Sequence, residues 1–221
     1  MFLDRVDAGR QLALRLPQLR DRDPVVVGLP RGGVVVGAQV ASALRAPLDV
    51  IVVRKLGAPP APEVAMGALG EGGVLVVNDD VVRRAGVRPA EFAEVRAREQ
   101  AELDRRVRRL RTVPRTPLAG RVVVVVDDGV ATGATARAAC QVARAEGAQR
   151  VVLAVPVVAA DMLPALRTVT DEVAYVDAPV EFQAVGQWYD DFTQVADSEV
   201  AALLAQAAHD QRVRATSRAA R

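Results

Sequence analysis

Two adjacent carboxylates and a loop rich in glycine and threonine follow an unbroken run of five valines, Val122–Val126. β-Branched residues in such a run are typical of a strand that is buried on both faces of a parallel sheet. Asp127 and Asp128 then lie at the carboxyl end of that strand, where open α/β sheets bind their ligands. In the next segment, 129–135, two glycine backbones, two threonine hydroxyls and the start of an alanine-rich helix are suited to hold a phosphate group.

The two carboxylates narrow the choice of ligand for this loop. Carboxylates beside a phosphate site repel the phosphate unless they face another group, such as ribose hydroxyls or a hydrated Mg²⁺. A sugar phosphate satisfies both parts of the motif. A strand ending in two aspartates also occurs in receiver-like and other doubly wound proteins, in which the loop would be only a turn and a helix cap. The spacing DDxxxTGxT is more restrictive than a lone glycine pattern, and the sequence has no GxxxxGK(S/T) loop, so we favour the sugar phosphate.

A second candidate phosphate site follows an earlier valine-rich segment. Pro30, Arg31, Gly32 and Gly33 stand between this expected strand and a helix that we expect to begin near Val34. Exposed glycine N–H groups at a helix N-terminus and a forked guanidinium suit a diphosphate. An ordinary tight turn would explain the same four residues, and it is the combination with the first motif that favours the diphosphate.

DDGVATGAT resembles the phosphoribosyl diphosphate (PRPP) binding motif of the type I phosphoribosyltransferases, which is a hydrophobic strand, two acids, then TG and T. Through LPRGG, RKLGAPP, DDGVATGAT and VGQWYDDF the whole chain is also similar to stand-alone phosphoribosyltransferase-domain proteins of undefined acceptor. The resemblance implies that Asp127 and Asp128 hold the ribose 2′ and 3′ hydroxyls, that residues 131–135 wrap the 5′-phosphate, and that the Pro30–Arg31 peptide bond is cis. The PRPP-binding residues are then expected to be Arg31, Gly32, Gly33, Asp127, Asp128, Gly129, Ala131, Thr132, Gly133, Ala134 and Thr135.

The segment 57–73 is rich in glycine and proline without periodicity, so we expect a long loop in the place of the family's flexible catalytic lid. Just before it stands Lys55, the only lysine of the chain, whose compact ammonium could reach a diphosphate oxygen or a metal-bound water. Drift in an arginine-favouring genome would also leave a single lysine. Glu63 is the only acid between Lys55 and Gly70 and is a candidate general acid or base, with a solvated loop carboxylate as the alternative. The candidate catalytic residues are Lys55, Glu63, Asp127 and Asp128.

Aromatic residues, scarce elsewhere, gather in the segment 177–195. Their faces would stack on a flat heterocyclic base, although a local core would gather them equally well. The segment is similar to the hood of hypoxanthine-type enzymes, which implies acceptor contacts from Phe182, Val185 and Trp188 and a Mg²⁺ site made by Asp127, Asp128 and Asp190, partly through PRPP or water. Those enzymes have an acid in the phosphate loop where this chain has Ala131, so a purine acceptor does not follow from the resemblance.

Strand and helix patterns alternate along most of the chain, which predicts one α/β domain. Together with the resemblance, this implies a three-layer Rossmann-like fold with a central parallel sheet of about five strands flanked by helices, plus a small C-terminal hood. We expect a single domain over residues 1–208 and a mobile basic tail over 209–221. Helices are expected at residues 5–16, 34–44, 89–110, 135–146, 161–169 and 198–208. Strands are expected at residues 24–29, 48–53, 74–78, 122–126, 151–155 and 172–176.

Composition excludes several classes of protein. The formal net charge is +2, so nothing in the overall charge argues for nucleic acid as a partner. The charged helix 89–110 reads as a solvated surface or as a contact in a homodimer. One cysteine, Cys140, rules out an intrachain disulfide, and no apolar run is long enough for a membrane span, so we expect a cytoplasmic protein without a membrane partner.

These observations lead to one expected activity and two alternatives. The expected activity is Mg²⁺-dependent transfer of the 5-phosphoribosyl group of PRPP to a nitrogenous acceptor, with release of pyrophosphate. A PRPP-sensing regulatory domain would keep the phosphate loop without turnover. A hydrolase of phosphoribosyl compounds would need no acceptor base.

Overall fold

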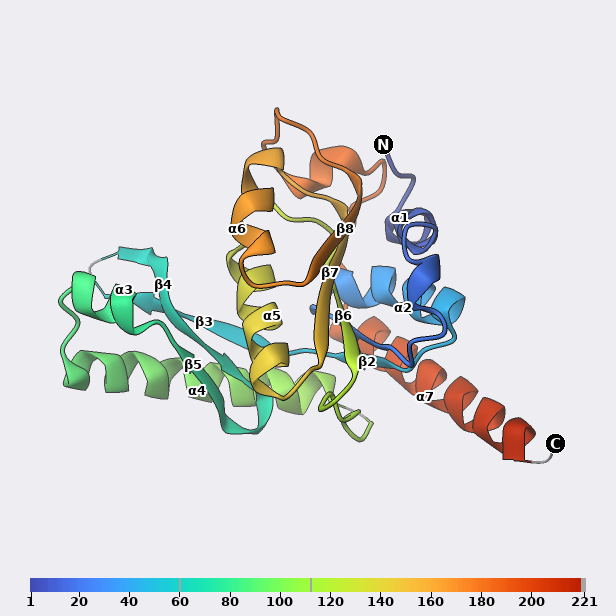
Figure 1. Cartoon of the computed structure of the whole chain (residues 1–221), viewed down its shortest axis with the longest axis horizontal. Coiled ribbons are helices and arrows are strands. Elements are labelled where there is room, and N and C mark those ends of the chain that lie inside the picture. The colour runs from blue at the N-terminus through green and yellow to red at the C-terminus, as the bar shows by residue number, and fades with distance from the viewer. Residues whose placement is uncertain (60, 112, 220–221) are drawn as a thin grey trace.

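A five-stranded parallel sheet forms the centre of the molecule (Figure 1), as the sequence predicts. The computed structural model describes residues 1–59, 61–111 and 113–219, without the side chains of residues 63, 214, 215 and 217–219. The strand order is β2-β1-β6-β7-β8, and every neighbouring pair is parallel. The strands are β1 (Val25–Gly28), β2 (Leu48–Val50), β6 (Val122–Val126), β7 (Arg150–Val157) and β8 (Glu172–Asp177).

Helices cover both faces of this sheet and make three layers. α1 (Arg5–Ala13) and α2 (Gly32–Leu44) pack on one face, and α5 (Ala134–Ala145) and α6 (Leu163–Arg167) pack on the other (Figure 1). The valines of β6 divide between the two cores: Val124 and Val126 join the cluster with α2, whereas Val123 and Val125 join the cluster with α5. Burial on both faces explains why this strand is apolar at every position.

A second sheet replaces the expected lid loop. The described residues of the segment 57–73 are mostly regular, because β3 (Val53–Ala58) and β4 (Ala61–Gly70) pair as antiparallel strands, followed by a short 3₁₀ turn, η2 (Glu71–Gly73). β5 (Val74–Val77) pairs antiparallel with β4, so it belongs to this sheet and not to the parallel one. The glycines of this segment, which had favoured a loop, allow close packing between strands. A Cβ at position 67, for example, would lie 2.3 Å from the Val76 carbonyl oxygen.

α4 (Pro89–Leu110) has the bounds expected for it, whereas two other helices depart from the sequence expectations. The first is α3 (Asp79–Arg84), which is capped by the Asn78 side chain and was not expected. α7 (Asp197–Ala219) continues through the segment expected to be a mobile tail, and residues 220–221 lie outside the described part of the chain. No glycine or proline follows residue 197, so nothing in the sequence ends this helix earlier.

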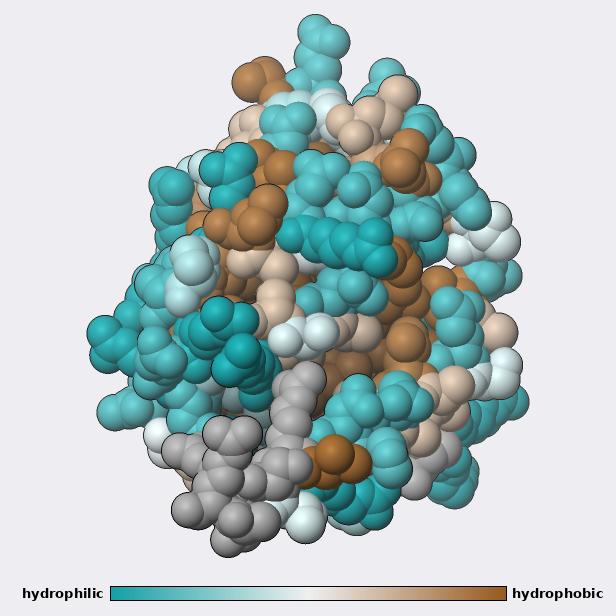
Figure 2. Space-filling view, turned by 90° about the vertical axis from the view of Figure 1, so that its right-hand side faces the viewer, coloured by the Kyte–Doolittle hydropathy of each residue, from teal (hydrophilic) through white to brown (hydrophobic). Residues whose placement is uncertain are grey.

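Shorter elements complete the chain. The expected helix 5–16 ends at Ala13 and is followed by η1 (Pro17–Leu19), and the expected helix 161–169 is reduced to η3 (Ala160–Met162) and α6. The last 3₁₀ turn is η4 (Val185–Trp188). Within the described ranges, no helix has both the length and the apolar character needed to cross a bilayer. The face that carries α1, α2 and α7 is mostly hydrophilic, with hydrophobic residues scattered between (Figure 2).

A buried carboxylate anchors the end of α4 to the edge of the parallel sheet. Asp49 in β2 has 2% of its surface exposed. Its oxygens accept hydrogen bonds from the Arg111 guanidinium at 2.6 Å and from the Thr116 N–H at 2.6 Å. Arg111 also donates to Glu71 at 2.7 Å. This network joins α4, β2 and η2, and the charge of Arg111 offsets the cost of burying Asp49.

Candidate functional site

The two glycine motifs meet at the carboxyl edge of the parallel sheet. β1 and β6 are neighbours, with Gly28 opposite Val126, so the segments that follow them start side by side. A Cβ built on Gly33 would lie 2.5 Å from the Val126 carbonyl oxygen and 2.8 Å from the Asp127 Cα atom. The backbone of the Pro30–Gly33 loop therefore lies directly against the two acids. The Pro30–Arg31 peptide bond is cis, which confirms the sequence expectation.

The segment 129–135 forms the loop that leads into α5. Gly133 has a φ of 71°, a left-handed conformation that favours glycine, and it precedes the first residue of the helix, Ala134. Thr132 and Thr135 are exposed, and Ala131 and Ala134 are half-buried. Gly129 and Gly133 are buried, so the accessible groups of this loop are the two hydroxyls beside the helix N-terminus, which suit a phosphate.

The paired carboxylates differ in their surroundings. The Asp128 N–H donates to Asp127 Oδ1 at 2.9 Å, and burial, followed by the negative charge of Asp128, raises the pKa of Asp127 well above its ordinary range. Asp128 is held by Arg5, whose Nε lies 2.8 Å from Asp128 Oδ2. The Tyr189 hydroxyl donates to the Asp128 carbonyl oxygen. Sequence reasoning missed Arg5, which belongs to no motif and lies 123 residues from Asp128. Tyr189 lies in the motif VGQWYDDF, but nothing in that motif indicated a contact with Asp128.

Cations gather beside the two loops. Lys55 and Thr135 line the same cavity of about 660 Å³, between β3, α4 and the start of α5. Arg31 lines a neighbouring cavity of about 450 Å³ and lies 3.8 Å from Asp197. Arg106 lines both cavities, and partial burial followed by the charges of Arg54 and Arg31 lowers its pKa. The charge pattern of α4 predicts a solvated helix, and the Arg106 side chain is 46% exposed, in agreement with that prediction. Its position beside Arg31 was not predicted.

The expected hood lies over the phosphate loop. Val185 contacts Gly129 so closely that a Cβ at position 129 would be 2.4 Å from the Val185 Cγ1 atom. The rings of Phe182 and Trp188 stack on each other, with centroids 6.2 Å apart. The Trp188 indole N–H is buried and has no hydrogen-bond partner among the described residues. The hood therefore offers an unsatisfied donor and two stacked rings, and acceptor contacts from these residues remain a prediction.

The metal and acid–base assignments remain predictions as well. Asp127 and Asp128 supply carboxylate oxygens, the ligands that Mg²⁺ prefers, which fits a metal that completes its coordination with phosphate oxygens and water. Asp190 is exposed, and its N–H donates to the Phe2 carbonyl oxygen. Within the described part of the chain, no three metal-ligating side chains form a cluster. Glu63 lies in β4, and its side chain is outside the described residues.

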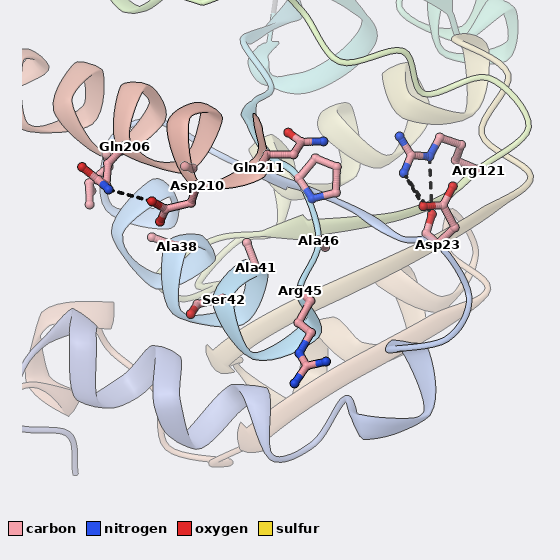
Figure 3. Close-up of a pocket in the computed structure, with 13 residues that line it drawn as sticks. Asp23, Ala38, Ala41, Ser42, Arg45, Ala46, Arg121, Gln206, Asp210 and Gln211 are labelled. Carbon is pink, nitrogen blue, oxygen red and sulfur yellow. Dashed lines mark hydrogen bonds and ion pairs between the residues drawn. The ribbon is translucent and has the colours of Figure 1, made fainter. Parts of the chain in front are cut away.

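Another cavity, of about 670 Å³, lies between α2 and α7 (Figure 3). Asp23, Pro47 and Arg121 line it, and these residues precede β1, β2 and β6. The cavity is therefore at the amino ends of the strands, opposite to the two loops. None of the site residues expected from the sequence is among its described lining residues, so the candidate site is the carboxyl edge.

Known proteins resemble this chain along most of its length. The family model for the phosphoribosyl transferase domain matches residues 4–176. Two curated proteins of Mycobacterium tuberculosis, from strains CDC 1551 and H37Rv, are provisionally named phosphoribosyl transferases and are 55% identical over 211 residues. The match covers 95% of this chain and 48% of theirs, so the chain spans about half the length of these relatives. The crystal structure of TT1426 from Thermus thermophilus superposes with a TM-score of 0.87 at 45% identity, covering 92% of this chain and 97% of that one.

Proposed function

Since this chain belongs to the phosphoribosyl transferase domain family, we propose that it transfers the 5-phosphoribosyl group of PRPP to a nitrogenous acceptor and releases pyrophosphate. The observation that supports this most is one contact. The Gly32–Gly33 backbone lies against the Asp127–Asp128 pair, and the phosphate loop continues directly from these acids. A diphosphate, a ribose and a 5′-phosphate would thus find suitable groups in the order in which PRPP carries them.

In this proposal the chain binds and orients the reacting atoms. The phosphate loop holds the 5′-phosphate, and Asp127 and Asp128 accept hydrogen bonds from the ribose hydroxyls. The acceptor nitrogen attacks C1′ with its lone pair while the bond from C1′ to the diphosphate oxygen breaks, and the electron pair leaves with pyrophosphate. Positive charge develops on the ribose ring and is stabilised by the two carboxylates.

Negative charge develops on the leaving diphosphate. Arg31, Lys55 and the Gly32 and Gly33 N–H groups would stabilise it, and Arg106 adds positive charge beside Arg31. Asp127 and Asp128 would hold Mg²⁺ together with PRPP, and that ion supplies further charge neutralisation when bound. We propose that the β3–β4 hairpin closes over the site and excludes water, with Glu63 accepting the acceptor's proton.

Assembly and location complete the proposal. We propose a homodimer that acts in the cytoplasm, with the exposed surface of α4 as the contact between subunits. Light scattering of the purified chain measures its mass in solution. A monomeric mass at assay concentration would contradict the dimer and leave the reaction untouched.

The decisive experiment is calorimetric titration of PRPP with Mg²⁺ present, followed by an assay of pyrophosphate release with a panel of bases. We expect binding, and pyrophosphate release only when a suitable base is present. Binding without release would identify a sensor, and release without any base would identify a hydrolase. A wild-type chain that binds no PRPP would refute the site itself.

A pair of double variants tests the two acids. Asp127→Asn with Asp128→Asn should abolish PRPP binding, because each amide loses the negative charge and puts an NH₂ donor in place of one acceptor oxygen. Asp79→Asn with Asp80→Asn changes another adjacent acid pair, exposed in the first turn of α3, and should bind PRPP like wild type. Equal affinity for PRPP in the two double variants would show that Asp127 and Asp128 do not bind the sugar.

A further inference from the structure

One cation reaches the sugar site from a distant part of the chain. Arg5 stands in the first turn of α1, 123 residues before Asp128, and 11% of its side chain is exposed. Its Nε donates to Asp128 Oδ2 at 2.8 Å, and its Nη1 donates to the Thr193 carbonyl oxygen at 2.9 Å. Its guanidinium carbon lies 3.9 Å from the centroid of the Phe192 ring. The guanidinium thus joins α1, the phosphate loop and the hood.

The diphosphate loop leaves almost no free space around this ion pair. A Cβ built on Gly32 would lie 1.9 Å from Asp128 Oδ2 and 2.6 Å from Arg5 Nε. The Gly32 backbone therefore packs directly on the Arg5–Asp128 contact. If Arg5 moved away when the sugar binds, Asp128 would lose its cation and the contacts of Arg5 to Thr193 and Phe192 would break. We therefore expect Arg5 to stay in place during binding.

We propose that Arg5 is a positioning residue of the sugar site, which fixes the orientation of the Asp128 carboxylate and holds the hood in register with it. This inference rests on the proposed function. A planar fork can serve the carboxylate, a carbonyl oxygen and an aromatic face at the same time, whereas a lysine ammonium at this position could not match all three. With Oδ2 fixed by Arg5, Asp128 has a single orientation to present to a ribose hydroxyl.

The test compares Arg5→Gln and Arg5→Lys with Arg10→Gln, an exposed arginine of the same helix. Titrated with PRPP and Mg²⁺, Arg5→Gln should lose about tenfold or more in affinity, and Arg5→Lys should lose less because it keeps the charge. Affinity for inorganic phosphate, the probe for the phosphate loop, should change by less than about twofold in each variant. Arg10→Gln should match wild type throughout.

NMR of the backbone amides in the ligand-free protein at constant pH gives a readout that needs no PRPP. We expect Arg5→Gln to shift the signals of Asp128 and Thr193, which Arg5 contacts, and Arg10→Gln to leave them in place. If the Arg5 variants do not fold, Phe192→Leu removes only the ring beneath the guanidinium and should weaken PRPP binding by a smaller factor.

The outcomes separate this inference from the proposed function. Wild-type affinity in Arg5→Gln, or unchanged amide signals of Asp128 and Thr193, would overturn the role of Arg5 while the proposed reaction stands. Failure of the wild-type chain to bind PRPP would overturn the proposed function and with it the link from Arg5 to ribose. Equal losses for phosphate and PRPP would also overturn the inference, because they would indicate a general disturbance of the fold.

Discussion

Gly32→Ala offers the sharpest test of how the two loops meet. The added Cβ would stand 1.9 Å from Asp128 Oδ2, so this oxygen must move by about 1.5 Å to reach an ordinary contact. Such a shift breaks the 2.8 Å ion pair with Arg5. Overpacking of this kind costs about 1–3 kcal/mol, which predicts a fall in Tm of roughly 2–12 °C for a chain of this size. PRPP binding should be lost, because the displaced carboxylate no longer faces the ribose.

Gly37→Ala is the matched control within the same helix. A Cβ at position 37 would meet Leu48 at 3.4 Å and Val26 at 3.6 Å, which are ordinary contacts. Replacing a glycine inside a helix by alanine stabilises by about 0.5–1 kcal/mol, so Tm should rise by roughly 1–4 °C. Differential scanning calorimetry measures both variants, and titration with PRPP follows. A Gly32→Ala protein as stable as wild type would refute the contact between the Gly32 backbone and the ion pair.

Three further predictions concern groups that are buried or half-buried. Asp127→Asn should raise the Tm of the ligand-free protein near pH 7, and the gain should shrink on acidification, because a raised folded pKa makes ionisation of Asp127 costly only at higher pH. Arg111→Leu should cost about 3–5 kcal/mol in urea unfolding, since it leaves Asp49 buried without its cation. Burial raises the pKa of Cys140 to about 12, so iodoacetamide near pH 8 should modify the unfolded chain and spare the native one.

Exposed residues of the same types serve as controls for the first two of these variants. Asp21→Asn should leave Tm near pH 7 unchanged, and Arg108→Leu should leave the free energy of unfolding within about 0.5 kcal/mol of wild type. Rapid alkylation of Cys140 in native protein would contradict its burial. A destabilising Asp127→Asn would contradict the raised pKa of that carboxyl.

Much of the fold follows from local sequence patterns. The apolar run of β6 is long enough, and rich enough in valine, to require burial on both faces, so its place in the middle of the sheet could be predicted. The helix bounds of α4 follow from Pro89 at its start and from its steady charge pattern. The contact between the two glycine loops is likewise expected once β1 and β6 are adjacent and parallel.

The errors have specific physical reasons. Gly57, Gly67 and Gly70 read as loop residues, yet in β3 and β4 they admit a carbonyl oxygen or the Val142 side chain at close range. Local composition cannot separate these two uses of glycine. Arg5 was missed because its partners lie 123 and 188 residues away, and no periodic pattern encodes such a distance.

The first residues of the chain are part of the hood. The Phe2 N–H donates to the Trp188 carbonyl oxygen at 2.8 Å, the Asp190 N–H donates to the Phe2 carbonyl oxygen at 2.9 Å, and the Phe2 ring is 2% exposed. Deletion of Phe2 would therefore take two hydrogen bonds from the backbone around Trp188, and comparison of PRPP affinity in the shortened and the full chain would report directly on that bridge.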